Sequence, residues 1–170
     1  LELSRLSTAP TRLDPAQIAP FSAKTLQQLP FEAVAERLPE GTDPDAAARA
    51  WPVVAPNLER LADLSDWLRL LREGPDAAER AEALAALKPE DRAYLAQAAA
   101  LLPPRPWTAE SWGDWTRACA AATGRKGGAL YRPLRLWLTG RGRGPEMAAL
   151  MPLLAGPLPP PPAPPPAPQG

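Results

Sequence analysis

The sequence predicts an all-α fold, a multi-helix bundle followed by a disordered proline-rich tail. Ala and Leu dominate the apolar residues and favour helices, whereas the β-branched and aromatic residues that strands need are few. Between Leu58 and Leu71, leucines recur every three or four residues, which places them on one face of a helix. Prolines and glycines punctuate the chain at spacings suited to helix ends.

Short helices separated by prolines are expected near the beginning of the chain. Residues 1–13 read as an irregular or extended lead-in. Asp14, which precedes a proline, suits a helix start, because its carboxylate can cap the first turn and proline is tolerated there. Pro20 interrupts this helix, and helical segments are expected again over 22–29 and 31–38.

Longer helices are expected in the rest of the chain. Capping residues, prolines and glycine turns mark their ends, and Pro52 and Pro56 are candidate breaks. The expected ranges are 44–73, 76–87, 89–102, 108–123, 129–138 and a short helix opening at Pro145. The proline-rich run from Gly156 onward cannot form helix or sheet and should sample polyproline II.

Composition argues against several kinds of site. Histidine is absent, which removes the commonest general base and the commonest metal ligand. With a single cysteine, Cys119, there is no disulfide framework and a zinc site is disfavoured. We expect Cys119 to be a buried structural thiol, because it lies in an apolar helix. The glycine motifs that bind nucleotide phosphates are missing, so no catalytic residue and no metal ligand are assigned.

The expected surroundings are those of a cytoplasmic protein. No apolar run approaches the ~20 residues of a membrane helix, and a lone thiol suits a reducing cytosol. The opening Leu1-Glu-Leu3 has neither an initiator Met nor a signal peptide, so we expect a fragment of a longer protein. An oligomer is not expected.

The charges are unevenly distributed, although the net charge is zero. Residues 1–116 carry 12 basic and 18 acidic side chains, whereas residues 117–146 carry 7 basic and 1 acidic. The segment 124–146 has a glycine-rich basic turn on each side of an expected helix, and backbone amides in such turns can approach an anion closely. A phosphate backbone is the natural target of such a surface.

Seven basic side chains are candidates for contacts with phosphates or bases. The first choices are Arg125, Lys126, Arg132, Arg141 and Arg143. Arg5 and Arg12, which alternate with hydroxyl side chains in the lead-in, are second choices for sugar–phosphate contacts. The alternative is that the cations of the turns are merely solvated and that the lead-in is an ordinary linker. For Arg135 a structural role, bonding a helix end or a buried carboxylate, is favoured over RNA contact.

The six tryptophans are candidates for stacking on unpaired bases, but most are expected in the core. Trp67, Trp112 and Trp137 lie among apolar neighbours at helical spacing, which favours burial. Trp107 follows a proline and precedes a helix start, so its place is left open.

A resemblance to a known family rests on the basic segment, which reads Gly124-Arg-Lys-Gly-Gly-Ala-Leu-Tyr-Arg-Pro-Leu-Arg-Leu-Trp-Leu-Thr-Gly140 and then Gly144-Pro-Glu146. This run resembles the C-terminal signature of bacterial glutamyl-tRNA synthetases, which are class I enzymes. Three upstream segments also resemble parts of that family in the same order: Leu3-Ser-Arg-Leu-Ser7, Lys88-Pro-Glu-Asp91 and Pro106-Trp-Thr108.

The resemblance implies a division of the chain and a partner. Residues 1–30 would end the region that contacts the tRNA stem, residues 31–155 would form a helical anticodon-binding domain, and residues 156–170 would be a tail. The partners would be tRNA, either tRNA-Glu alone or tRNA-Gln as well, and the catalytic domain of the same protein, with no membrane. ATP and Mg²⁺ belong to that catalytic domain, so neither a cofactor nor enzymatic activity is expected of this chain alone.

Two other functions stay open on the sequence. A helical adaptor could recruit a partner through the polyproline face of its tail. A catalytically inactive synthetase paralogue would carry the same motifs.

Overall fold

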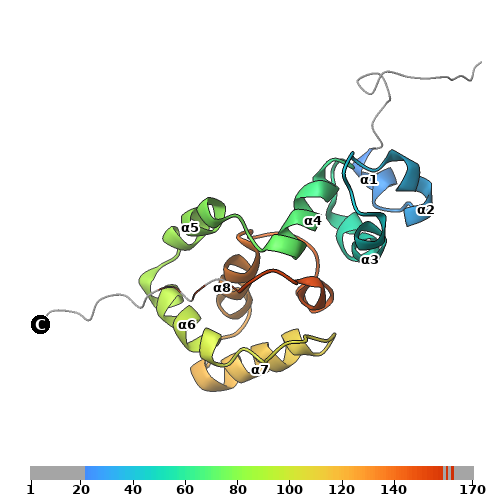
Figure 1. Cartoon of the computed structure of the whole chain (residues 1–170). Helices are drawn as coiled ribbons and strands as arrows, with labels where there is room; N and C mark the ends of the chain where they lie inside the picture. Colours follow the sequence, from blue (N-terminus) through green and yellow to red (C-terminus); the bar gives the residue numbers. More distant parts are fainter. Residues whose placement is uncertain (1–21, 159, 161, 163–170) are drawn as a thin grey trace, which may run out of the picture.

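The computed structural model describes residues 22–158, 160 and 162, which form helices joined by turns (Figure 1). No strand occurs among these described residues, so the predicted all-α class is confirmed. The helical elements are α1 (Ala23–Leu26), α2 (Phe31–Val34), η2 (Ala35–Arg37), α3 (Pro44–Val54), η3 (Ala55–Asn57), α4 (Asp63–Glu73), α5 (Ala77–Ala85), α6 (Pro89–Ala100), α7 (Ser111–Thr123), α8 (Gly128–Thr139), α9 (Met147–Leu150) and η4 (Met151–Leu153). Arg5, Arg12 and the predicted helix start at Asp14 lie outside the described residues.

Helices begin where the sequence carries start signals. The carboxylates of Asp43 and Asp76 accept hydrogen bonds from backbone N–H groups in the first turns of α3 and α5, at 3.0 and 2.9 Å. Pro44 and Pro89 occupy the first turns of α3 and α6, where a missing N–H removes no helical hydrogen bond.

Several predicted helices differ in extent from those observed; α1 is shorter than the expected 22–29, and α9 begins at Met147, after the expected Pro145. The expected helix over 44–73 is two helices, α3 and α4, separated by η3 and a short loop. Pro52 lies inside α3 without ending it, and Ala48, whose carbonyl loses its helical partner, is an exposed residue. The helix expected from Thr108 begins at Ser111, whose Oγ accepts the N–H of Thr108 at 2.8 Å and holds that stretch in a turn.

The helices form two groups that α4 connects (Figure 1). The smaller group contains α1, α2 and α3, and α4 packs against α3. The larger group contains α5, α6, α7 and α8, and α8 contacts the other three. The short helix α9 contacts both α3 and α7, so the C-terminal part of the described chain returns to the junction between the groups.

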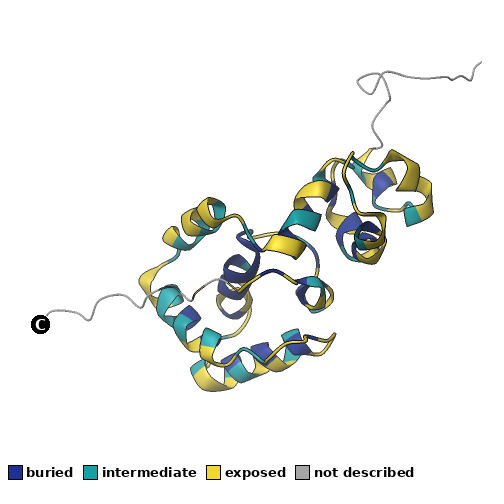
Figure 2. Cartoon of the chain, in the orientation of Figure 1, coloured by how far each residue is buried: buried dark blue, intermediate teal, exposed yellow. Residues whose placement is uncertain are grey.

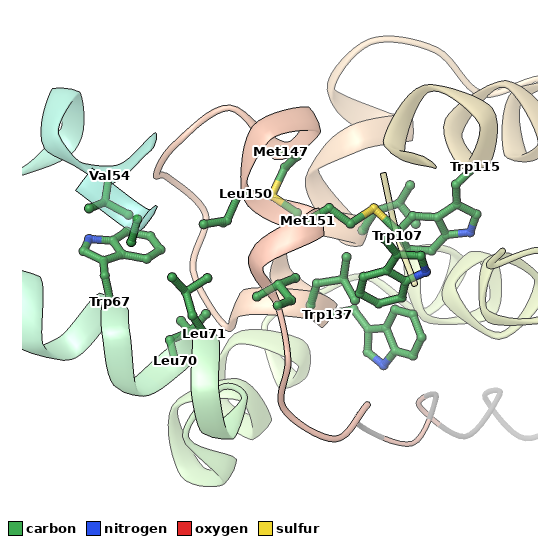
Figure 3. Packing of buried hydrophobic residues seen from close by; sticks show 14 of the residues in the cluster. Val54, Trp67, Leu70, Leu71, Trp107, Trp115, Trp137, Met147, Leu150 and Met151 are labelled. Atoms are coloured by element: carbon green, nitrogen blue, oxygen red, sulfur yellow. The ribbon is translucent and has the colours of Figure 1, made fainter. Parts of the chain in front are cut away.

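One hydrophobic cluster extends through both groups. Figure 2 shows buried positions in both groups, with exposed positions on the same helices. Figure 3 shows side chains of α3 and α4 at one end of this cluster, Met147, Leu150 and Met151 in the middle, and Trp107, Trp115 and Trp137 at the other end. The predicted burial of Trp67 and Trp137 is confirmed, and Trp107 is buried as well. Trp112 is only partly buried, unlike the prediction, because one side of its indole faces the surface groove described below.

Cys119 has no exposed surface, as predicted, and burial raises the pKa of its thiol. The tail contains no helix among its described residues. Its first part is nevertheless packed on the domain, since Gly156 is buried and the N–H of Ala155 donates to the carbonyl of Leu71 at 2.7 Å.

Candidate nucleic-acid interface

The basic segment predicted to face an anion is built around α8. The turns carrying Arg125 and Arg141 lie at the two ends of this helix, which at 1.5 Å per residue separates them by roughly 18 Å. The five first-choice cations therefore do not form one compact cluster. Their surroundings differ enough that each has to be considered separately.

Arg125 is bound to its own protein. Its Nη1 lies 2.7 Å from the carboxylate of Asp91 and also donates to the carbonyl of Ala129 at 2.9 Å. Its Nη2 donates to the carbonyl of Glu90, and the guanidinium lies 4.4 Å from the ring centroid of Tyr94. The side chain is only 19% exposed. These contacts tie the turn before α8 to α6 and give Arg125 a structural role.

Arg141 is held in a similar way at the other end of α8. Its guanidinium lies 4.6 Å from the ring centroid of Trp67 on α4, and its Nε lies 3.3 Å from the carboxylate of Glu79 on α5. The hydroxyl of Thr139 accepts the N–H of Arg141, which fixes the backbone of the turn. Arg141 therefore joins three helices, and an anion would have to compete with Glu79 for it.

The other three first-choice cations are exposed. Lys126, Arg132 and Arg143 face solvent, and within the described part of the chain none of them forms an ion pair. Arg132 lies on the outer face of α8, where Gly128, Tyr131 and Arg135 share its helical spacing. These three cations can bind an anion without breaking an internal contact.

Arg135 forms a structural contact within the protein, as the sequence predicts. The acceptor is a backbone carbonyl. Its Nη1 donates to the carbonyl of Pro145 at 2.9 Å, and burial lowers the pKa of its guanidinium. The side chain is partly buried. Arg135 also lines a groove, so one edge of the guanidinium bonds the backbone while the side chain borders open space.

This groove lies between α7, α8 and the start of α9 and has a volume of about 530 Å³. Its lining combines aromatic rings, two arginines, a hydroxyl and a glycine without a side chain to block it. The lining residues are Trp112, Gly113, Thr116, Arg117, Tyr131, Arg135, Glu146 and Met147.

The aromatic rings of the groove continue outward from the core. Trp115 and Trp137 are buried with ring centroids 6.0 Å apart, and Trp112 meets Trp115 edge to face at 5.8 Å. Tyr131 lies 6.3 Å from Trp112 at an interplanar angle of 31° and is 46% exposed. An exposed ring supported by a packed column is a rigid platform on which a further planar group can stack.

The charges around this platform are mainly basic. Arg135 lies one turn after Tyr131 on the same face of α8, Arg117 lies across the groove on α7, and Arg132 is exposed on α8 without lining the groove. Arg117 contacts Asp114 of its own helix, but both side chains are largely exposed, which makes the pair easy to exchange for another partner. Guanidinium groups beside a stacking platform can donate to phosphate oxygens and to base edges.

Much of this groove could not be predicted from the sequence. The pattern of apolar neighbours favours burial of Trp112 and does not single out Tyr131 or Arg117. One signal was present, because Tyr131 and Arg135 have the i, i+4 spacing that puts an aromatic ring beside a cation on one helix face. Which part of α7 lies opposite them depends on tertiary packing.

The described residues contain no group of three or more His, Cys, Asp or Glu side chains arranged to hold a metal ion. Nor does any helix in that part of the chain have the length and apolarity needed to cross a membrane.

Comparison with known proteins identifies the family. The family model described as an anticodon binding domain matches residues 18–156. Similar curated proteins include glutamate–tRNA ligase 2 of Xanthobacter autotrophicus (43% identical over 154 residues), glutamate–tRNA ligase 1 of Ruegeria pomeroyi (45%) and glutamate–tRNA ligase 1 of Cereibacter sphaeroides (44%). These alignments cover 90 or 91% of this chain but 32 or 33% of the relatives, so the chain spans about a third of their length.

The resemblance found in the sequence is thereby confirmed. The family model covers most of the residues, including all of the groove between α7 and α8. The chain belongs to the anticodon-binding domain family.

Proposed function

We propose that this chain is the tRNA-binding part of a glutamate–tRNA ligase and that the groove between α7 and α8 receives an unpaired base of the tRNA. The observation that supports this most directly is Tyr131, an exposed ring supported by Trp112 in a groove that Arg117 and Arg135 also line. Proteins recognise single-stranded RNA by stacking its bases on aromatic rings and by hydrogen bonding their edges. Anticodon bases are unpaired in a free tRNA and meet this requirement.

The exposed cations would hold the backbone of the same loop. Lys126, Arg132 and Arg143 are the side chains we assign to phosphates, because none of them has to leave an internal partner. Neutralising three phosphates gives a log–log slope of affinity against salt of roughly −2 to −3. Arg125 and Arg141 would support this surface through their contacts with Asp91 and Glu79 and would not touch RNA directly. For Arg5 and Arg12 the predicted sugar–phosphate contacts stay predictions.

The remaining functions of the ligase would reside outside this chain. We infer that ATP and Mg²⁺ act on a catalytic domain elsewhere in the protein and that this chain needs no cofactor to bind tRNA in the cytoplasm. The partner in this proposal is tRNA-Glu, with tRNA-Gln as the alternative. An adaptor that displays its tail is less well supported, because the first part of the tail is packed on the domain. An upstream catalytic domain in the same reading frame would distinguish a ligase fragment from an inactive paralogue.

The proposal is tested by titrating tRNA-Glu against the chain at several salt concentrations. Replacing Tyr131 by Ala removes the platform and should weaken binding about tenfold, since stacking on an aromatic ring contributes roughly 1–3 kcal/mol per base. Tyr131→Phe keeps the ring and should bind within about twofold of the unchanged chain. Arg72→Ala removes an exposed arginine of α4 that is not part of the groove and serves as the charge control.

A second RNA separates base recognition from general attraction to a polyanion. A tRNA-Glu transcript whose anticodon bases are paired into an extended stem retains the phosphates but offers no unpaired base. The proposal expects weaker binding of this transcript and no further effect of Tyr131→Ala on it. Equal binding of both transcripts would refute the assignment of the groove to an unpaired base.

A further inference from the structure

The chain leaves η4 and runs across the domain as a segment that we call the strap, residues 154–158 and 160. The backbone N–H groups of Ala155 and Gly156 both donate to the carbonyl of Leu71, at 2.7 and 3.2 Å. At the other end, the indole N–H of Trp137 donates to the carbonyl of Pro160 at 3.1 Å. The strap is thus fixed at both ends to different helices, α4 and α8.

Gly156 shows how closely the strap approaches α4. A Cβ atom at this position would lie 2.4 Å from the backbone nitrogen of Gly74 and 2.5 Å from the carbonyl carbon of Glu73. Both are backbone atoms, which cannot rotate away as the end of a side chain can. Only glycine fits here. The close packing of the strap on the end of α4 therefore depends on a glycine at position 156.

Between its two anchors the strap lies on an apolar floor. Leu70, the turn Gly74–Pro75, Arg105 and Leu138 surround Leu154, Pro157 and Leu158. The space left between strap and floor is about 10 Å³, hardly enough for a single water molecule. The strap therefore occupies its groove almost completely, although Leu158 keeps 41% of its surface exposed.

The donor at the far end suits a proline-rich ligand. Proline has no N–H, so a run of prolines offers carbonyl groups as its hydrogen-bonding atoms, and its extended conformation requires little loss of entropy on binding. Aromatic grooves that bind such segments combine ring surfaces with donors to these carbonyls. Trp137 is 2% exposed and directs its only polar atom to Pro160.

We propose that the end of α4, the α4–α5 turn and α8 form a polyproline-binding groove, and that its occupant in the intact chain is the chain's own strap, residues 154–158 and 160. Two independent observations support this proposal. The buried indole N–H of Trp137 donates to the carbonyl of Pro160, and residue 156 has no room for a Cβ. The groove is separate from the one assigned to RNA, because the two share no lining residue.

The first experiment measures whether the tail is held in the intact chain. A fluorophore is attached through Ala163→Cys, while Cys119, which is buried, stays unlabelled in the folded protein. The anisotropy of the label should be high in this chain and fall toward that of a free peptide when Gly156→Ala is added. Trp137→Phe, which keeps an aromatic ring but lacks the N–H donor, should lower the anisotropy as well. Gly142→Ala is the matched control, because a Cβ there meets nothing closer than a leucine methyl group at 3.9 Å.

The second experiment asks whether the groove accepts the ligand from another molecule. A synthetic peptide with the sequence of residues 157–170 lacks Gly156, so the clash introduced by Gly156→Ala does not apply to it. The peptide should bind the Gly156→Ala chain at least about fivefold more tightly than the intact chain, in which the tethered tail competes at high effective concentration. Adding Trp137→Phe to Gly156→Ala should abolish this gain.

Two results would overturn the proposal. One is a label at position 163 whose anisotropy is the same with and without Gly156→Ala, provided that circular dichroism shows both chains folded. The other is a peptide that binds the intact and substituted chains equally or binds neither of them.

Discussion

At the scale of single residues, Arg125 and Lys126 show how neighbouring cations acquire different tasks. Arg125→Ala should lower the free energy of unfolding by about 2 kcal/mol, because it leaves Asp91 and the carbonyls of Glu90 and Ala129 without their charged donor. Lys126→Ala should change the free energy of unfolding by less than ~0.5 kcal/mol, since its side chain is exposed. Urea unfolding followed by tryptophan fluorescence measures both.

The tRNA affinity of the same two variants should show the reverse order. Lys126→Ala should weaken binding a few-fold and reduce the salt slope by about one, as expected for a single phosphate contact. Arg125→Ala, assayed well below its melting temperature, should bind nearly as the unchanged chain does. If Arg125→Ala lost as much affinity as Lys126→Ala, Arg125 would have to contact RNA despite its internal partners.

Cys119 makes stability depend on alkaline pH. Burial raises the pKa of its thiol above the ordinary value near 8.5 of an unfolded chain. The neutral thiol is therefore favoured by folding, and its contribution is complete below that ordinary value and declines as the pH rises above it. Unfolding free energies measured at pH 7.5 and 9.5 should fall with pH, and Cys119→Ala should reduce that fall. An unchanged pH dependence in the variant would contradict the assignment to Cys119.

At the scale of elements, α8 lacks one backbone hydrogen bond, and an arginine side chain supplies a donor in its place. Pro133 lies inside α8 and has no N–H, so the carbonyl of Ala129, four residues earlier, loses its helical partner. The guanidinium of Arg125 donates to that carbonyl at 2.9 Å. The buried proline and the arginine of the preceding turn are therefore coupled through one acceptor.

A double-mutant cycle measures this coupling. Pro133→Ala restores a backbone N–H for Ala129 and should make the subsequent loss of Arg125 less costly, by roughly 0.5 kcal/mol or more. Each single variant and the pair are compared by urea unfolding. Arg117→Ala, combined with Pro133→Ala, is the control, because Arg117 lies on the surface of α7 and has no contact with that carbonyl. Simple additivity for Arg125 would contradict the coupling.

The elements also show what one sequence can and cannot predict. The helix start at Asp76 could be predicted, because capping depends on a residue only three positions away. The ion pair of Arg125 joins residues 34 apart and that of Arg141 residues 62 apart, and such pairings arise only when the helices pack. For the same reason, the sequence reveals a basic segment but does not reveal which of its cations are bound to other helices and which are exposed.

At the scale of the whole molecule, α8 is fastened at both ends and exposes between them the face that we propose binds RNA. Arg125 binds the turn before α8 to α6, and Arg141 binds the turn after it to α4 and α5. The strap adds a third attachment through Trp137. Three consecutive helices, α4, α5 and α6, thus hold α8 with Tyr131 and Arg135 in a fixed position, which is the preorganisation that the proposed binding of an unpaired base would require.

Gly144 is where the turn after α8 meets α4. A Cβ at Gly144 would lie 2.7 Å from Cη2 of Trp67, which is buried under Arg141, and the backbone there has a φ of 154°. Gly144→Ala should therefore lower the free energy of unfolding by about 3 kcal/mol through overpacking and backbone strain. It should also weaken tRNA binding several-fold in the folded protein, because the neighbouring Pro145 supplies the carbonyl that positions Arg135.

The same control variant, Gly142→Ala, lies two residues away in the same turn and has room for a Cβ. Urea unfolding and tRNA titration of the two variants separate the effect of the close approach from that of a stiffer turn. The expected outcome is a loss of stability and affinity for Gly144→Ala alone, because only this position touches Trp67 and adjoins the anchor of Arg135. A Gly144→Ala chain that is destabilised but binds tRNA with unchanged affinity would show that the RNA groove does not depend on how α8 and α9 meet α4.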